Sequence, residues 1–162
     1  MTGHKESTAS TVSHGKFVIE RRFDFAPQTV FAAFADPAQK RRWFVEGEGW
    51  TIDGYEADFR VGGFERSRFR FGGGDPMGND TLYIDIVENR RIVFAYAMTM
   101  KDKAFSASVA TIELQPEGKG TLLVYTEQVA HLDGVDTTAD RESGCRDLFE
   151  ALNAFLGSNA AA

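Results

Sequence analysis

The sequence predicts an α+β domain in which a curved antiparallel sheet of about seven strands wraps around a long C-terminal helix. From residue 50 to residue 130, short segments with apolar residues at every second position alternate with turn residues. A similar segment precedes them near the N-terminus, and an amphipathic helical pattern follows near the C-terminus. Because strands and long helix are segregated along the chain, we expect the helix to cover one face of the sheet.

The chain has 162 residues, which suits a single domain. Residues 1–15 are rich in Ser, Thr and His and bring little apolar surface, so they are predicted to form a flexible N-terminal tail. We expect the folded domain to occupy residues 16–158. Residues 159–162 are then a frayed C-terminus.

The first elements follow from alternation and from two prolines. Residues 17–25 carry Phe or Ile at every second position, apart from Arg21, and are predicted to form a strand. Pro27 suits the first turn of a helix. Asp36 followed by Pro37 is typical of a helix cap, and predicts a second short helix that runs toward Trp43.

The later strands are predicted from repeated alternation between turn signals. Residues 72–79, with the sequence GGGDPMGN, are expected to form a mobile loop, because glycine, proline and asparagine favour turns. Connections this short favour antiparallel neighbours. The predicted strands cover residues 50–60, 62–71, 81–88, 91–100, 105–115 and 121–130.

The clearest element is the last helix. Thr137 and Asp140 have the spacing of a capping box, and an apolar stripe follows them. The stripe consists of Cys145, Leu148, Phe149, Leu152, Phe155 and Leu156. A helix with one apolar face needs a sheet to cover, and a gap between the two would form a natural ligand cavity.

Composition excludes several classes of function. There are 18 Lys and Arg against 24 Asp and Glu, and a net charge of −6 argues against nucleic acid as a partner. The single cysteine, Cys145, excludes an intramolecular disulfide and zinc sites that need two cysteines. His4 and His14 lie in the predicted tail, so we expect no metal site, and no motif indicates a cofactor. The sequence has no apolar run of ~20 residues, so we expect no insertion into a membrane. It also has no signal peptide, so we expect a cytoplasmic location.

Alternation also predicts which side chains face the cavity. Several polar groups fall on the same strand faces as bulky apolar residues, as an oriented small ligand would need. Arg66, Arg68 and Arg70 fall on the opposite, solvated face. The candidates for the ligand cavity are Trp43, Glu65, Ser67, Tyr96, Met98, Ser106, Ser108, Tyr125, Glu127 and Cys145.

The two inward carboxylates, Glu65 and Glu127, allow two interpretations. A carboxylate buried in an apolar cavity has a raised pKa and can act as a general acid or base. Alternatively, each one pairs with an arginine or lies at an open rim; Arg141 is within reach of such a carboxylate. Cys145 is most simply a core residue, and its pairing with His131 as a nucleophile and base is a second, weaker hypothesis.

An ordered set of short motifs resembles one superfamily. The set begins with FVIERRFDFAPQTVFAAFADPAQKRRWF at residues 17–44 and continues with DFRVGG at 58–63 and DIV at 85–87. It ends with TEQ at 126–128, then Leu132-Asp133-Gly134 and Arg141-Glu142-x-Gly144. This set is similar to the START-related, Bet-v-1-like (SRPBCC) helix-grip superfamily, in the branch of activators of heat-shock-protein-ninety ATPase. The resemblance spans about residues 17–156 and implies the helix-grip fold.

Members of this superfamily include lipid and hormone carriers, polyketide cyclases and co-chaperone domains, so the fold does not fix the function. We therefore keep three hypotheses. The leading one is a protein that binds a small hydrophobic or amphipathic ligand, with no assignable catalytic activity. The second is a cyclase- or aldolase-like enzyme with Glu127 or Glu65 as general base. The third is a protein-interaction module with a chaperone as a possible partner.

Overall fold

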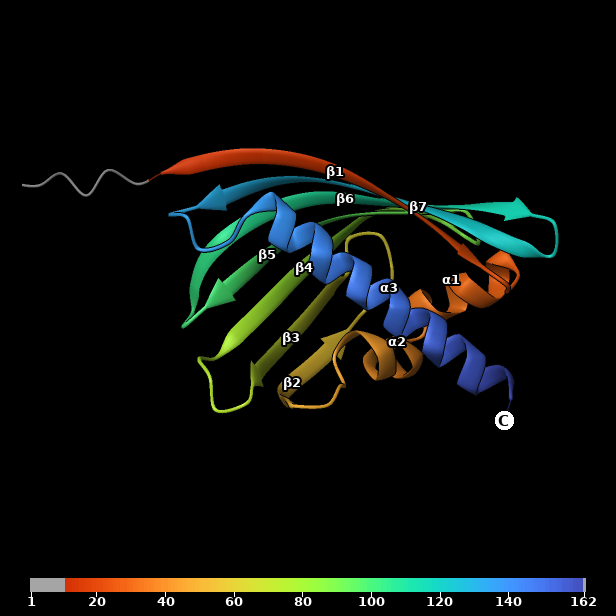
Figure 1. The fold of residues 1–162 in the computed structure, drawn as a ribbon, viewed down its shortest axis with the longest axis horizontal. Helices are drawn as coiled ribbons and strands as arrows, with labels where there is room; N and C mark the ends of the chain where they lie inside the picture. The colour runs from red at the N-terminus through yellow and green to blue at the C-terminus, as the bar shows by residue number, and fades with distance from the viewer. Residues whose placement is uncertain (1–10, 162) are drawn as a thin grey trace, which may run out of the picture.

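The computed structural model describes residues 11–161; the predicted tail residues 1–10 lie outside this range. Within it the chain forms a seven-stranded sheet and three helices (Figure 1). In chain order the elements are β1 (Val12–Phe23), α1 (Pro27–Ala35), α2 (Pro37–Phe44), β2 (Trp50–Ala57), β3 (Phe64–Phe71), β4 (Met77–Val87), β5 (Arg91–Met100), β6 (Lys103–Glu117), β7 (Gly120–Leu132) and α3 (Thr138–Ala160).

The sheet is antiparallel throughout, in the order β1-β7-β6-β5-β4-β3-β2. Strands β2 to β7 are each paired with their neighbours in the sequence, whereas β1 pairs with β7. Helices α1 and α2 make the connection between the two edges, and α3 runs across the concave face (Figure 1). This arrangement confirms the predicted fold class.

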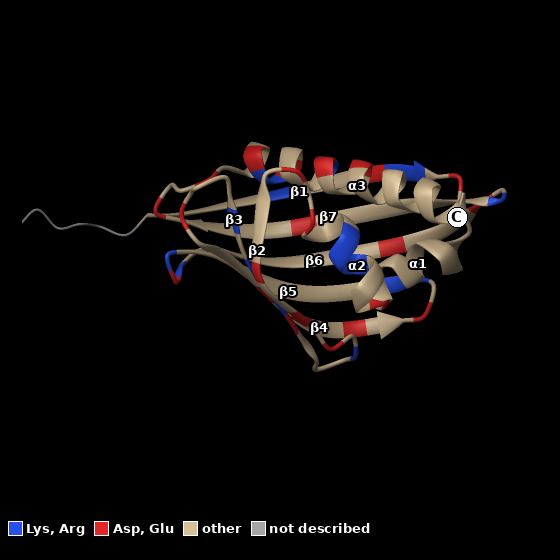
Figure 2. Ribbon diagram, turned by 90° about the horizontal axis from the view of Figure 1, so that it is seen from below, with Lys and Arg blue, Asp and Glu red and all other residues tan. Residues whose placement is uncertain are grey.

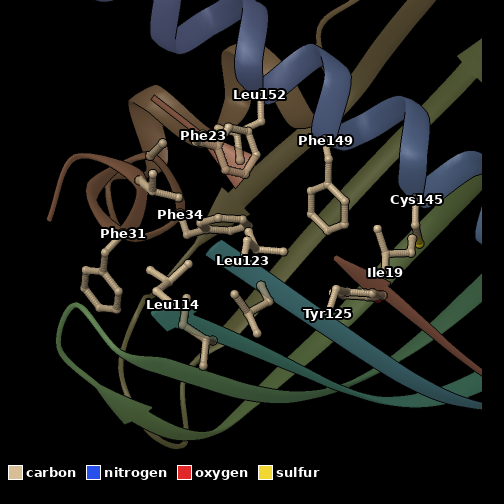
Figure 3. Packing of buried hydrophobic residues seen from close by; sticks show 14 of the residues in the cluster. Ile19, Phe23, Phe31, Phe34, Leu114, Leu123, Tyr125, Cys145, Phe149 and Leu152 are labelled. Carbon is tan, nitrogen blue, oxygen red and sulfur yellow. The ribbon is translucent and has the colours of Figure 1, made fainter. Parts of the chain in front are cut away.

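Apolar residues of the concave face and of α3 form one continuous core. Leu123 of β7 and Leu152 of α3 are completely buried, and Tyr125 packs edge-on against Phe149 with ring centroids 5.3 Å apart. Figure 3 shows Cys145, Phe149 and Leu152 projecting from α3 toward the sheet. The predicted stripe of α3 therefore does cover the sheet, and its burial is the main force that holds the helix there.

Both predicted helix caps are present. The Asp36 side chain accepts a hydrogen bond from the backbone N–H of Ala38 at the start of α2. At the start of α3, Thr137 accepts from the N–H of Asp140 while the Asp140 carboxylate accepts from the N–H of Thr137. This reciprocal capping box fixes where α3 begins, and with it the residues that α3 presents to the sheet.

The ends of several elements differ from the prediction, three of them at the predicted tail, loop and C-terminus. Strand β1 begins at Val12, inside the segment expected to be a tail, because the backbone of residues 12–16 pairs with residues 128–132 of β7. Strand β4 begins at Met77, so only the first part of the expected loop at 72–79 is a turn. Helix α3 continues to Ala160, beyond residue 158. In β1 and β4, backbone pairing with the neighbouring strand begins before the segment in which apolar residues alternate.

The outer face of the sheet is exposed to solvent and carries charged side chains. Arg68 forms an ion pair with Asp80 and Arg70 one with Asp53, both at the surface, while Arg66 is exposed. The three arginines thus lie on the outer face, as predicted. Among residues 11–161, no helix is both long and apolar enough to cross a membrane.

Candidate functional site

A cavity of about 640 Å³ lies between the sheet, α2 and α3. Its walls are mainly aromatic and aliphatic. Strand β5 contributes every second residue from Ile92 to Met100, as its alternation predicted. The other large apolar walls come from Phe34, Trp43, Phe44, Trp50, Phe59, Phe69, Met77, Phe105, Ile112, Leu148 and Phe149.

The predicted site residues fall into two groups. Those that line the cavity are Trp43, Glu65, Ser67, Tyr96, Met98, Tyr125 and Cys145. Ser106, Ser108 and Glu127 share the same buried face but do not line the cavity. Instead they form a polar cluster behind Tyr96 and Arg141.

Glu127 is the centre of this cluster and has no exposed surface. The hydroxyl of Tyr96 lies 2.8 Å from both carboxylate oxygens, and the hydroxyl of Tyr125 donates to Oε1 at 2.5 Å. Oε2 accepts from the hydroxyl of Ser108 at 2.8 Å and from the guanidinium of Arg141 at 3.1 Å. Hydrogen bonds and a counter-ion therefore satisfy the carboxylate without any ligand.

Arg141 joins this carboxylate to a second one. Its guanidinium also donates to Ser106 at 2.6 Å and to Asp136 at 2.9 Å. Asp136 in turn lies 2.7 Å from Nδ1 of His131, whose Nε2 lies 3.0 Å from the hydroxyl of Thr138. The start of α3 is thus tied to the interior of the sheet through one charged network.

Burial sets the protonation of the tyrosines in this network. Burial, together with the Glu127 carboxylate, raises the pKa of Tyr96 and Tyr125 above the usual value of 10.0. Burial alone would lower the pKa of Arg141, but its acidic neighbours raise it. The tyrosines therefore stay protonated as donors and Arg141 stays charged, so the arrangement favours the interpretation in which Glu127 is paired rather than free to act as a base.

A second buried ion pair lies at the α2 side of the cavity. Lys40 of α2 is 8% exposed and lies 2.7 Å from a carboxylate oxygen of Glu65, which is 2% exposed. The hydroxyls of Tyr55 and Tyr83 lie 2.9 Å and 3.2 Å from the other oxygen. The Nζ of Lys40 is also 4.6 Å from the ring centroid of Phe44, where a cation is favoured. Glu65 is therefore paired too, with a lysine rather than an arginine.

The structure does not bring Cys145 and His131 together as nucleophile and base. The Cys145 thiol lies 3.8 Å from Glu127, while His131 contacts Asp136 and Thr138. Burial, together with the Glu127 carboxylate, raises the pKa of Cys145 from 9.0 to about 12. The thiol is protonated at neutral pH, which fits a core residue.

We therefore expect Cys145 to be almost inert toward iodoacetamide in the folded protein. At pH 8, a thiol pKa about three units higher reduces the thiolate fraction roughly 1,000-fold. Mass spectrometry of timed samples, folded and in urea, would measure the two alkylation rates. Equal rates in the two states would contradict the burial of this thiol.

Little in the sequence indicates that Lys40 and Asp136 belong to the site. Lys40 lies in a short, mostly polar helix with no pattern that marks one residue as buried, and Asp136 lies in a turn. Arg141 was expected only as a possible partner of Glu127, and it also binds Asp136.

Across residues 11–161, no three His, Cys, Asp or Glu side chains are grouped so as to hold a metal ion.

A curved antiparallel sheet that grips a long C-terminal helix over a cavity defines the helix-grip class of proteins, which the sequence motifs also resemble. Within that class, the chain belongs to the family described as activator of Hsp90 ATPase homolog 1-like protein, whose family model matches residues 24–157. No curated protein matches the chain.

Solved structures of relatives agree with this fold. The Mll3558 protein from Rhizobium loti is 50% identical, with a TM-score of 0.83 over 90% of this chain and 99% of its own. An uncharacterized protein from Rhizobium leguminosarum is 37% identical, with a TM-score of 0.89 over 93% of this chain and 99% of its own. Protein CV1439 from Chromobacterium violaceum, at 23% identity and a TM-score of 0.72 over 87% and 96% of the two chains, shares the fold.

Proposed function

We propose that this protein binds an apolar or amphipathic small molecule in the cavity between the sheet and α3. One observation carries the proposal: a volume of about 640 Å³ is left within the fold of a chain of 162 residues. Small-molecule pockets typically have volumes of ~300–1,000 Å³ and apolar walls with a few polar groups. A core that only had to be stable would be packed without such a volume.

The lining also supports an oriented ligand. Rings from α2, β3, β5 and α3 surround the cavity, including Trp43, Phe69, Phe94 and Phe149. Several buried polar side chains of the lining are fixed by their own hydrogen bonds, as the Tyr96 hydroxyl is by Glu127. A ligand would therefore gain most of its affinity from apolar contact, and the polar positions would set its orientation.

No specific observation favours the other two hypotheses to the same degree. Both oxygens of Glu127 and both oxygens of Glu65 already accept hydrogen bonds, so a general base would first have to lose them. A chaperone partner is suggested by the name of the family alone.

The direct test is native mass spectrometry of the purified protein, combined with a thermal-shift screen of lipids, flavonoids and polyketide-like aromatics. A ligand that binds only the folded state adds about 2.7 kcal/mol when present at 100 times its Kd. A co-purified molecule, or a compound that raises Tm progressively as its concentration increases, would support the proposal. No stabilisation by any compound, with no co-purified molecule, would reject it and favour the interaction module.

Filling the cavity is expected to weaken binding without unfolding the domain. Met98→Trp adds a bulky ring to the wall formed by β5, so an active compound from the screen should bind at least about tenfold more weakly. Leu82→Trp is the matched control, because Leu82 lies on the outer face and is 36% exposed. Titration calorimetry measures both. Unchanged affinity in the Met98 variant would place the ligand elsewhere.

A further inference from the structure

The mouth of the cavity can be located from the exposure of its lining residues. Most lining residues are buried or half-buried, and those that are exposed come from two segments only. One is the connection after α2, at residues 46–50, and the other is residues 135–151, which include the first half of α3. A ligand therefore enters between this connection and α3.

The exposed charged side chains that line this mouth are all acidic. The exposed charged residues of the lining are Glu46, Asp140 and Asp147. Arg41 neutralises Glu46 at 2.9 Å, and Asp140 caps α3. Asp147 takes part in none of the ion pairs formed within residues 11–161, and Figure 2 shows several acidic positions along α3. A ligand meets a negative potential at the entrance.

The cationic side chains deeper in the cavity already form ion pairs with carboxylates. Lys40 is held by Glu65 at 2.7 Å, and Arg141 by Glu127 at 3.1 Å and Asp136 at 2.9 Å. An anionic group that entered would have to lose its water and compete with buried carboxylates for either cation. An uncharged polar group does not compete with these carboxylates for a cation and has less hydration to lose. A cationic group is attracted by the acidic mouth.

We infer that the cavity selects uncharged or cationic amphipathic molecules and rejects anionic ones with the same apolar body, such as carboxylates and sulfonates. This inference rests on the proposed function and specifies the class of ligand. Asp147 is the specificity-determining residue at the mouth, since its carboxylate lines the cavity, is exposed and is not balanced by an ion pair within residues 11–161.

The test compares two dyes that differ by one sulfonate: N-phenyl-1-naphthylamine, which is uncharged, and 1-anilinonaphthalene-8-sulfonate. Fluorescence titration should give a Kd at least about tenfold lower for the uncharged dye at low salt. Asp147→Lys should shift the ratio of the two Kd values at least about threefold toward the sulfonate, and added salt should shrink this shift.

Glu20→Lys is the matched control, because it changes the net charge equally from an exposed position of β1 that does not line the cavity. It should leave the ratio unchanged. Equal or tighter binding of the sulfonate to the wild-type protein, or an equal effect of Glu20→Lys and Asp147→Lys, would overturn the inference and leave ligand binding intact. If neither dye nor any screened compound binds, the proposed function itself fails.

Discussion

Replacing Arg141 with methionine is expected to lower the free energy of unfolding by about 3–5 kcal/mol, the usual cost of removing one partner of a buried ion pair. Arg141 is the cation that balances Glu127 and Asp136, at 3.1 Å and 2.9 Å. The side chain of Glu127 is completely buried, so removal of the guanidinium leaves its charge without a counter-ion. Methionine keeps much of the apolar length of arginine, and the loss therefore reports mainly the uncompensated charge.

Urea denaturation at neutral pH measures this effect. Arg146→Met is the matched control: Arg146 also lies on α3, but its side chain is 53% exposed and its ion pair with Glu142 measures 3.5 Å. Such a surface pair is worth about 0–1 kcal/mol. Adding Glu127→Leu to the Arg141 variant should recover part of the loss. A loss in the Arg141 variant no larger than in the control would contradict the assigned network.

Replacing Lys40 with methionine should have an effect of the same size, about 3–5 kcal/mol, for the same physical reason. It leaves Glu65 buried with only the hydroxyls of Tyr55 and Tyr83 as donors. Lys101→Met is the control, because Lys101 is 68% exposed and lies 3.5 Å from Asp75. Urea denaturation again provides the measurement.

The pH dependence of the Lys40 effect distinguishes a paired lysine from a lysine buried without a counter-ion. Burial alone would lower the pKa of Lys40, but Glu65 outweighs it and the pKa rises above 10.5. A group whose pKa is raised on folding contributes its full stability below its unfolded pKa and loses it as the pH rises through the folded pKa. The difference between wild type and Lys40→Met should therefore be constant from pH 7 to pH 9. A difference that rises within this range would mean that the pKa of Lys40 is lowered on folding, and would contradict the ion pair.

Much of the fold was predictable because side-chain alternation reports which face of a strand is buried. The period-two pattern correctly placed Tyr96, Ser108 and Glu127 on the concave face of three different strands. The start of β1 at Val12 was not predictable in this way. Its first residues are held by backbone hydrogen bonds to β7, and such bonds leave no pattern in the side chains.

The site was less predictable, because its ion pairs join elements whose relative positions depend on the completed fold. Arg141 lies 14 residues from Glu127, and the sequence indicated it as a possible partner. Lys40 lies 25 residues from Glu65, and a lysine in a helix with the sequence PAQKRRWF is normally exposed. Only the placement of α2 against the sheet edge buries it.

The pairing of β1 with β7 has a consequence for how the chain acquires its structure. The backbone N–H of Thr11 bonds to Asp133, 122 positions further along the chain. The first strand to leave the ribosome must therefore wait for the last one before either is paired along this edge. Contacts so distant in sequence slow the search for the native state. During that interval the alternating Phe and Ile residues of β1 are open to wrong partners, so expression at reduced temperature or with chaperones should increase the soluble yield.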